Sequence, residues 1–197
     1  MNDELITSVH ECLLRGGVVL LPTDTVYGLA VHPERDEAAE RLFRMKRRPR
    51  ARNLPIMVAA TADLPALGAI VNVPARRLLE AFAPGPLTVA LGLRPGAAPE
   101  WLAGRVEIGV RIPADEDLRA LLQITGPLLA TSANVHAQAT RESVAEILAD
   151  LDGAPDLVID GGPRDTTPST LVNCNLPEPV IERLGMLSAE QIEKVLQ

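Results

Sequence analysis

Two periodicities of hydrophobic residues divide the chain into predicted helices and strands. Residues 4–14 carry apolar side chains at helical spacing and are followed by Gly16 and Gly17, which predicts a helix that ends there. Residues 18–21 form a continuous apolar run that ends at Pro22, the pattern of a strand buried on both faces. The same criteria predict helices over 36–46, 63–70, 74–82, 116–122, 141–149 and 188–196, and strands over 55–59, 87–93, 107–112, 128–132, 157–160, 169–173 and 180–183.

The order of these elements predicts the fold class. Strands alternate with helices over most of the chain, which is typical of an α/β fold in which helices cover both faces of a sheet. The strands predicted after residue 157 have no helix between them, so we expect a mixed sheet with antiparallel pairs near its carboxyl-terminal part. The 197 residues contain no internal repeat and no linker-like stretch, and we expect a single domain over 1–197.

Composition excludes several classes of protein. Hydrophobic residues make up 47% and charged residues 23%, and no apolar run reaches the roughly 18 residues of a membrane span. Asp3 and Glu4 stand where a signal peptide would be basic, so we expect no secretion signal and a cytoplasmic protein. Cys12 and Cys174 lack metal-ligand spacing, which favours reduced thiols and predicts no metal site.

Positive charge is concentrated in one segment of an acidic chain. The net charge is −7, yet residues 44–52 hold six cations and no acid, which leaves 13 basic against 26 acidic residues elsewhere. Such a segment should bind an anion, and the acidic remainder would oppose a long polyanion, so a small polyphosphate fits best. A solvated helix end and a non-specific nucleic-acid contact are the alternatives.

Polar clusters directly follow several predicted strands, where open α/β sheets place ligand sites. The clusters are Pro-Thr-Asp-Thr at 22–25, the cations of 46–52, Thr-Ser-Ala-Asn at 131–134, Asp-Gly-Gly at 160–162, Pro-Ser-Thr at 168–170 and Glu-Arg-Leu-Gly at 182–185. Strand alternation would place Ser132 and Asn134 on the same side. An ordinary proline turn at 22–25 and a helix cap at 132–134 are the structural alternatives.

The absence of familiar motifs narrows the chemistry. The chain has no GxxxxGK[ST] loop, no GxSxG elbow and no HExxH pair, and its three histidines lie apart from most of the polar clusters. What remains is fixed positive charge with neutral hydrogen-bond donors, which suits the positioning of anions during phosphoryl or nucleotidyl transfer.

The clusters together resemble those of the YrdC-like L-threonylcarbamoyladenylate synthases, and the likeness covers nearly the whole chain. The matching segments, in order, are GGVVLLPTDTVYGLA from Gly16, Lys-x-Arg-Pro at 46–49, PGPLT at 84–88, VRIP at 110–113, TSAN at 131–134, DGG at 160–162, PST at 168–170 and the arginine-glycine ending at 183–185. Each motif alone is weakly specific, whereas eight in the same order are highly specific.

The resemblance implies an open, twisted mixed α/β sheet with a large concave basic cavity. It also implies a nucleotidyltransferase that joins L-threonine, bicarbonate and ATP into threonylcarbamoyl-AMP with release of pyrophosphate, with Mg²⁺ accompanying ATP. The product would serve threonylcarbamoylation of the adenosine beside the tRNA anticodon. Its partners would then include a downstream tRNA threonylcarbamoyl-transferase complex, with weak or no direct tRNA binding and no membrane.

Individual roles are also implied by the matching motifs. The resemblance assigns catalysis to Lys46, Arg48, Ser132 and Asn134. It assigns threonine binding to Thr25, Arg111, Ala130 and Ser169, and ATP binding to Arg48, Arg52, Ser132, Thr140 and Arg183.

Several positions depart from the family pattern and keep alternatives open. Arg47 replaces a small residue, Asn53 stands where proline is common, residues 135–137 differ from the usual apolar-Ser-Gly, and Leu184 replaces proline. A paralogue acting on another adenylate or carbamoyl substrate is therefore an alternative. An RNA-binding or ribosome-assembly factor is another, which the overall acidity and the scarcity of aromatic residues disfavour.

Overall fold

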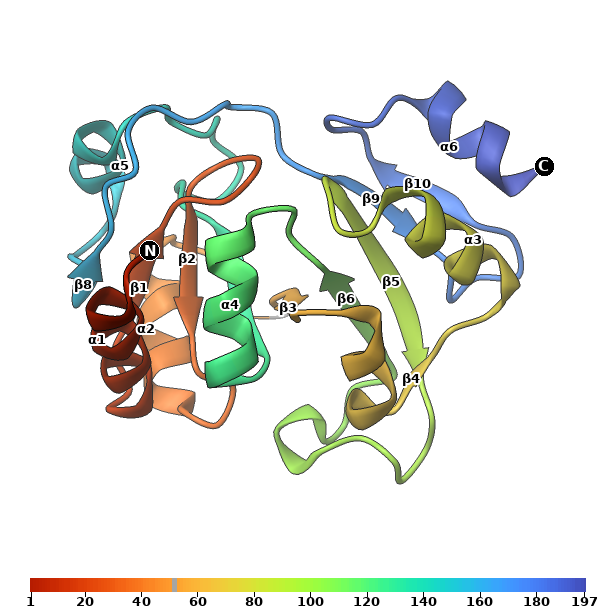
Figure 1. The fold of residues 1–197 in the computed structure, drawn as a ribbon, viewed down its shortest axis with the longest axis horizontal. Helices are drawn as coiled ribbons and strands as arrows, with labels where there is room; N and C mark the ends of the chain where they lie inside the picture. The colour runs from red at the N-terminus through yellow and green to blue at the C-terminus, as the bar shows by residue number, and fades with distance from the viewer. Residues whose placement is uncertain (51–52) are drawn as a thin grey trace.

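The computed structural model describes residues 1–50 and 53–197, which form a mixed α/β fold (Figure 1). The helices are α1 (Asp3–Leu14), α2 (Asp36–Met45), α3 (Val73–Phe82), α4 (Glu116–Thr125), α5 (Val144–Asp150) and α6 (Ala189–Leu196), with 3₁₀ helices at Thr61–Leu67 and Glu100–Leu102. The strands are β1 (Val19–Leu21), β2 (Gly28–Val31), β3 (Ile56–Met57), β4 (Ala69–Ile70), β5 (Leu87–Leu93), β6 (Glu107–Arg111), β7 (Leu128–Ser132), β8 (Leu157–Val158), β9 (Thr170–Asn173) and β10 (Val180–Arg183).

All ten strands join one mixed sheet in the order β10-β9-β5-β6-β3-β7-β2-β1-β8, and β4 pairs with β5. The pairs β1/β8, β3/β6 and β5/β9 are parallel, and the remaining pairs are antiparallel. The predicted mixed sheet is confirmed. The antiparallel pairing expected near the carboxyl-terminal part is confirmed by β9 and β10, and antiparallel pairs also occur in the other half of the sheet, where β2 lies between β1 and β7.

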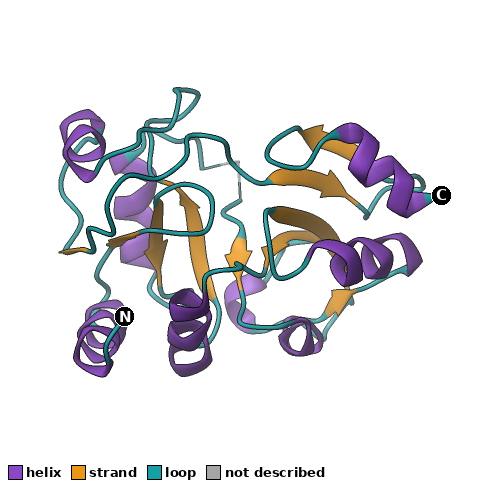
Figure 2. Ribbon diagram, turned by 45° about the horizontal axis from the view of Figure 1, so that its top comes forward, coloured by secondary structure: helices purple, strands orange, loops and turns teal. Residues whose placement is uncertain are grey.

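Helices cover both faces of the sheet, as predicted (Figure 2). The apolar residues of α1 and α4 pack on one face, and those of α2, α3, α5 and α6 pack on the other. Alternate residues of β1 enter opposite clusters: Leu20 joins the larger one, and Val19 and Leu21 join the smaller. Strand β1 is therefore buried on both faces, which explains its continuous apolar sequence.

The pocket described below occupies a part of this sheet where one face is not apolar. In β5, Val89 and Leu91 enter the larger core, whereas Thr88 and Ala90 point to the opposite face and line a pocket. In β6, Val110 is buried in the same core, and Gly109 and Arg111 line the pocket. Because side chains alternate along a strand, one face of β5 and β6 packs in the core and the other face forms a wall of the pocket.

Two elements differ from the sequence prediction for identifiable reasons. The helix expected over 63–70 is a 3₁₀ helix at Thr61–Leu67 followed by β4, because Pro65 lies inside it and Gly68, with φ 71°, ends it. Strand β2 was not predicted, because its four residues follow a polar turn without a periodic pattern of their own.

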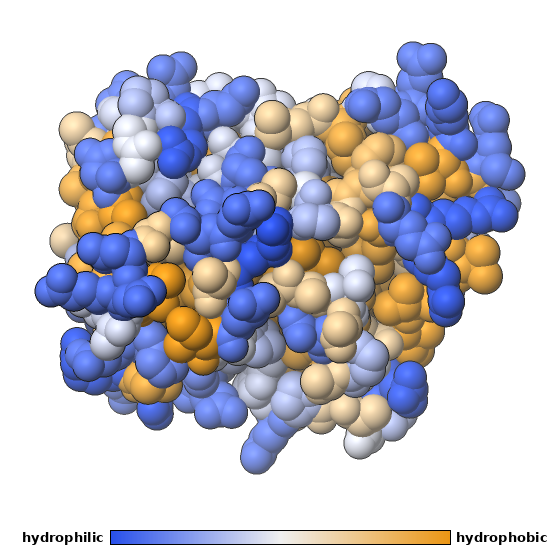
Figure 3. Space-filling view, viewed as in Figure 1, coloured by the Kyte–Doolittle hydropathy of each residue, from blue (hydrophilic) through white to orange (hydrophobic). Residues whose placement is uncertain are grey.

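Hydrophobic side chains reach the surface in both halves of the molecule (Figure 3), and Ile70 of β4 and Val73 of α3 are among the exposed ones. Within residues 1–50 and 53–197, every helix is too short or too polar to cross a lipid bilayer.

Candidate active site

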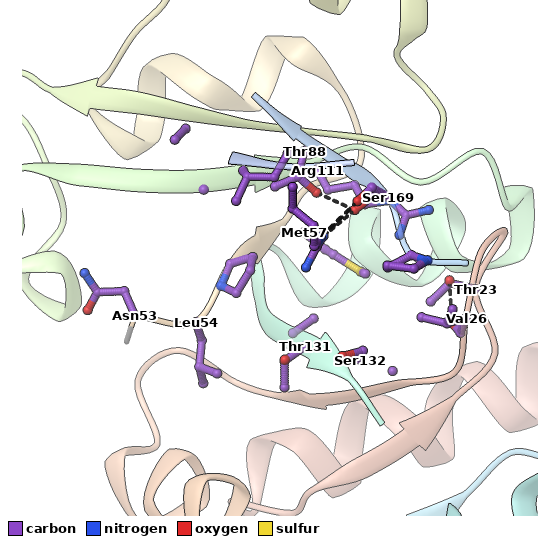
Figure 4. A pocket seen from close by; sticks show the side chains of 18 of the residues that line it. Thr23, Val26, Asn53, Leu54, Met57, Thr88, Arg111, Thr131, Ser132 and Ser169 are labelled. Carbon is purple, nitrogen blue, oxygen red and sulfur yellow. Dashed lines mark hydrogen bonds between the residues drawn. The ribbon is translucent and has the colours of Figure 1, made fainter. Parts of the chain in front are cut away.

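A pocket of about 530 Å³ lies on the polar part of the sheet face (Figure 4). Its walls come from segments far apart in sequence: the turn before β2, the segment before β3, strands β5, β6, β7, β9 and β10, and the end of the connection between β8 and β9. Six of the residues to which the sequence assigned a role line it, namely Arg48, Arg111, Ala130, Ser132, Ser169 and Arg183. Segments that precede and follow strands thus converge on one cavity.

Arg111 is the most buried charged side chain that lines the pocket, with 6% of its surface exposed. Its guanidinium donates to Asp24 Oδ1 at 2.7 Å, to Thr25 Oγ1 at 2.7 Å and to the Gly85 carbonyl at 3.3 Å. Burial lowers the pKa of Arg111, and the Asp24 carboxylate opposes that shift. Three of the five guanidinium protons are used, so donors remain for a ligand carboxylate in the pocket.

Ser169 lies beside Arg111 and connects two strands through its hydroxyl (Figure 4). Its Oγ is 2.7 Å from Thr88 Oγ1, and Arg183 donates to the same Oγ at 3.2 Å and to the Ser169 carbonyl at 2.9 Å. Gly185 permits this arrangement, because a Cβ there would lie 2.1 Å from the Pro168 carbonyl oxygen. A side chain at position 185 would therefore clash with the backbone, which explains why the final motif has glycine there.

Lys46 lies behind the pocket wall, with 1% of its surface exposed. It is the C-cap residue of α2, and its ammonium contacts the carbonyl oxygens of Ser132 and Asn134 and donates to Asn134 Oδ1 at 3.3 Å. Burial and the neighbouring Arg48 lower the pKa of Lys46 to about 7. Ser132 Oγ is 2.5 Å from Asn134 Oδ1, so the predicted hydroxyl-amide pair forms and Lys46 packs against it.

Arg48 reaches the pocket through an unusual turn. Arg47 has φ 49°, a left-handed conformation that a small residue adopts more easily, and it turns the chain after α2. Arg48 then lines the pocket and donates to the Asn53 carbonyl at 3.0 Å. The left-handed conformation of Arg47 and the backbone carbonyl of residue 53 therefore both contribute to the position of Arg48.

The remaining predicted residues are placed less centrally. Thr25 contacts Arg111 but does not itself line the pocket, and Thr140 donates to the Thr166 carbonyl at 2.5 Å, outside the pocket lining. Arg52 falls outside the described residues. Their assigned roles stay predictions.

Three residues of the lining, Glu107, Glu182 and Met57, have no role in the sequence prediction, although Glu182 lies in the polar cluster at 182–185. Glu107 and Glu182 line the pocket, and both accept hydrogen bonds from Asn173 Nδ2, at 3.1 and 2.7 Å. Met57 lies close to Arg111 and Ser169. The register of β5, β6 and β9 could have suggested these residues, but that register is not visible in the sequence. Because arginines and glutamates both line the pocket, its predicted basic character stays a prediction.

The arrangement can hold an anionic ligand with both charged and neutral donors. Arginine forks supply bidentate contacts, and the Ser132 and Ser169 hydroxyls supply neutral ones. Among the described residues, no three His, Cys, Asp or Glu side chains lie close enough to hold a metal ion.

The fold and this pocket define an α/β protein with a polar ligand site on one face of an open mixed sheet. A family model described as telomere recombination, that of Sua5, YciO and YrdC, matches residues 11–185. The chain belongs to the Sua5/YciO/YrdC family.

Relatives and solved structures agree with this assignment. A protein of Bacillus subtilis named threonylcarbamoyl-AMP synthase is 32% identical over 99% of this chain and 57% of its own length. The crystal structure of Pyrococcus abyssi Sua5 complexed with L-threonine superposes with a TM-score of 0.89 and 31% identity, over all of this chain and 58% of that one. Escherichia coli YciO gives a TM-score of 0.85 and 29% identity, over 97% and 94% of the two chains. The chain thus spans a little over half the length of the Bacillus protein and of Pyrococcus Sua5.

Proposed function

We propose that this chain is a threonylcarbamoyl-AMP synthase that joins L-threonine, bicarbonate and ATP. The amine of threonine attacks the carbon of bicarbonate, and water leaves to give a carbamate. A carbamate oxygen then attacks the α-phosphorus of ATP, and pyrophosphate departs. The product would pass to a tRNA threonylcarbamoyl-transferase complex. The name of the Bacillus relative and the L-threonine in the Pyrococcus structure support the proposal.

The observation that carries this proposal is the convergence of two polar segments on one pocket. The cationic turn after α2 brings Arg48 to the cavity, and Lys46 contacts the end of β7 where Ser132 and Asn134 lie. Two anions must approach each other in each step, and fixed cations and dipoles offset that repulsion without reorganising during the reaction. Catalysis would then be mainly positioning and electrostatic stabilisation.

The two ends of the reaction would use different residues. Arg111 and Ser169 would bind the threonine carboxylate and backbone, because both line the pocket and Arg111 keeps unused donors. Arg48, Ser132 and Arg183 would bind the ATP phosphates, with Mg²⁺ entering as part of the nucleotide substrate. Lys46 and Asn134 would shape the segment that presents Ser132. Thr25 would support Arg111, and the backbone at Ala130 would complete the threonine subsite. Arg52 and Thr140 would complete the ATP subsite.

Pyrophosphate release tests the proposal directly. The assay contains ATP and Mg²⁺ with L-threonine and bicarbonate, and each is omitted in turn. Release that requires both supports the synthase, and release independent of threonine contradicts it. Arg48→Ala should lose activity while circular dichroism shows an unchanged fold. An unfolded Arg48→Ala protein would assign Arg48 a structural role instead.

A paralogous activity on another adenylate or carbamoyl substrate is the second candidate. The observations in its favour are the departures from the family pattern at Arg47, Asn53 and Leu184. Pyrophosphate release without threonine would favour this candidate. Titrating tRNA at two salt concentrations tests direct tRNA binding, which neither candidate requires. Binding that rests only on counterion release would weaken steeply as the salt concentration rises.

A further inference from the structure

The connection between β8 and β9 crosses the whole sheet. Strand β8 is at one edge and β9 is next to the other edge, so residues 159–169 pass six intervening strands without forming a helix or strand (Figure 1). This segment, here called the crossover, ends at Pro168 and Ser169, which line the pocket. The crossover is therefore one of the attachments that position Ser169, beside the hydrogen bonds of Ser169 with Thr88 and Arg183 and that of the Pro168 carbonyl with the Met186 N–H.

The hydroxyl of Tyr27 holds the start of the crossover. Tyr27 is 1% exposed, and its hydroxyl donates to the Gly162 carbonyl at 2.7 Å and accepts from the Gly161 N–H at 3.0 Å. The guanidinium of Arg164 lies over the Tyr27 ring, 5.9 Å from its centroid. Gly161 approaches so closely that a Cβ there would lie 3.0 Å from Pro22 Cγ.

The backbone of Tyr27 holds the opposite wall of the pocket. Its carbonyl accepts from the Ala133 N–H at 2.7 Å, and the next residue, Gly28, pairs with Ser132 across β2 and β7. One residue thus connects the segment that carries Ser132 with the crossover that carries Ser169. Tyr27 also lines the pocket itself.

The far part of the crossover has further attachments. Thr140 donates to the Thr166 carbonyl, and the Arg164 N–H donates to the Glu142 carbonyl at 3.0 Å. These bonds attach the crossover to the loop after β7. At its start the Ile159 N–H donates to the Leu20 carbonyl at 2.9 Å, and the Tyr27 hydroxyl holds Gly161 and Gly162, which follow. Removing the Tyr27 hydroxyl alone should therefore loosen the start of the crossover and leave the Ala133 bond in place.

We propose that Tyr27 is a positioning residue that sets the distance between the Ser132 wall and the Ser169 wall through its carbonyl and its hydroxyl. This inference rests on the proposed function, in which Ser169 binds L-threonine. It gives the buried hydroxyl a role in the reaction without direct contact with the reacting atoms. Because the hydroxyl acts on the Ser169 side, the substrate affected should be threonine.

Tyr27→Phe is the test, because it removes the hydroxyl and keeps the ring and the backbone. We expect the KM for L-threonine to rise about fivefold, the change that one lost hydrogen bond produces, with the KM for ATP and kcat within about twofold of wild type. Hydrogen exchange should accelerate in peptides covering 160–168 and stay unchanged in peptides covering 131–134. Thr125→Val is the matched control, because it removes another part-buried hydroxyl bond, from the last residue of α4 to the carbonyl of its C-cap residue Gly126, and should leave both KM values unchanged.

The outcomes separate this inference from the proposed function. If wild-type protein releases pyrophosphate independently of threonine, the proposed function fails, and the exchange experiment still tests the Tyr27 anchor. If wild type is threonine-dependent and Tyr27→Phe changes neither the KM for threonine nor the exchange at 160–168, the inference is overturned. Equal rises in both KM values with a lowered melting temperature would also overturn it, because they indicate a general structural role.

Discussion

Lys46 and Asn134 are joined through both the main chain and the side chain of Asn134. The buried ammonium contacts the Asn134 carbonyl oxygen, donates to its Oδ1 at 3.3 Å, and also contacts the Ser132 carbonyl oxygen. These contacts bind the end of α2 to the end of β7, two elements separated by more than eighty residues. Lys46 therefore acts on the pocket through the segment that carries Ser132 and not by lining the cavity.

Replacing Lys46 by Met should damage both stability and activity. The substitution leaves buried carbonyl oxygens without a donor, which costs about 1–3 kcal/mol of unfolding free energy. Pyrophosphate release should fall with it, because Ser132 loses its fixed position. Urea unfolding and the pyrophosphate assay measure the two effects. Lys194→Met is the control, since Lys194 is the second lysine of the chain and is exposed on α6; equal losses in both variants would refute a special role for Lys46.

The pKa of Lys46 predicts a pH dependence of stability. Burial and Arg48 lower the pKa of Lys46 to about 7 in the folded protein, whereas an unfolded lysine titrates near pH 10.4. Between these values the unfolded chain binds more protons, so the contribution of Lys46 to the unfolding free energy rises with pH and falls as pH drops toward 7.

Wild type should therefore gain stability relative to Lys46→Met as pH increases. The expected gain is about 1.4 kcal/mol per pH unit, measured by urea unfolding of both proteins at pH 7.5, 8.5 and 9.5. Taking the difference between the two proteins removes the titration of groups that they share. A difference that stays constant over this range would mean that folded Lys46 keeps its proton.

The sequence predicted the elements whose patterns are local. Apolar runs located β1, β5 and β7, and the helix predicted over 188–196 is α6, in which Ser188 is the N-cap and forms both capping hydrogen bonds with Gln191. Strand alternation also predicted that Ser132 and Asn134 would meet. Each of these inferences needs only the periodicity or capping chemistry of neighbouring residues.

The parts that could not be predicted depend on distant contacts. A cationic run normally indicates a solvated surface, yet Lys46 is buried because β7 supplies carbonyl oxygens for its ammonium. The carboxylates of Glu107 and Glu182 meet at Asn173 only because of how β6, β5, β9 and β10 pair. No local pattern specifies strand order or register, so neither feature is visible in the sequence.

Arg183 should affect nucleotide binding more than threonine binding. Its guanidinium lines the pocket and donates to Ser169, and burial together with the neighbouring Arg111 lowers the pKa of Arg183. Arg183→Gln should weaken ATP binding about tenfold or more, because a charge-assisted hydrogen bond contributes roughly 1.5–3 kcal/mol. Isothermal titration with ATP and with L-threonine separates the two effects. Weaker threonine binding with unchanged ATP binding would move Arg183 to the amino-acid subsite.

Removing Mg²⁺ should abolish activity without unfolding the protein. In the proposed reaction Mg²⁺ enters bound to the phosphates of ATP, so it should not contribute to the fold of the ligand-free protein. EDTA in excess over Mg²⁺ should stop pyrophosphate release. A thermal melt of the ligand-free protein should give midpoints with and without EDTA that agree within about one degree. A large drop of the midpoint in EDTA would reveal a structural metal and contradict this view.

The buried pair of Arg111 and Asp24 should be energetically coupled more strongly than an exposed pair of the same length. Arg111 and Asp24 are 6% and 13% exposed and 2.7 Å apart, whereas Arg141 and Asp150, also 2.7 Å apart, are 43% and 28% exposed. Removing one partner of the buried pair leaves an uncompensated charge, so Arg111→Gln should lower the unfolding free energy by about 3–5 kcal/mol. Asp24→Asn in the same protein should restore part of that loss.

Two double-mutant cycles measured by urea unfolding compare the pairs. The cycle of Arg111→Gln with Asp24→Asn should give a coupling of about 1–3 kcal/mol, and that of Arg141→Gln with Asp150→Asn should give less than about 1 kcal/mol because water screens the exposed charges. The comparison holds the donor–acceptor distance constant and varies burial. Equal couplings in the two cycles would show that burial does not strengthen the Arg111 pair. Asp24 would then orient the guanidinium in the pocket without contributing to stability.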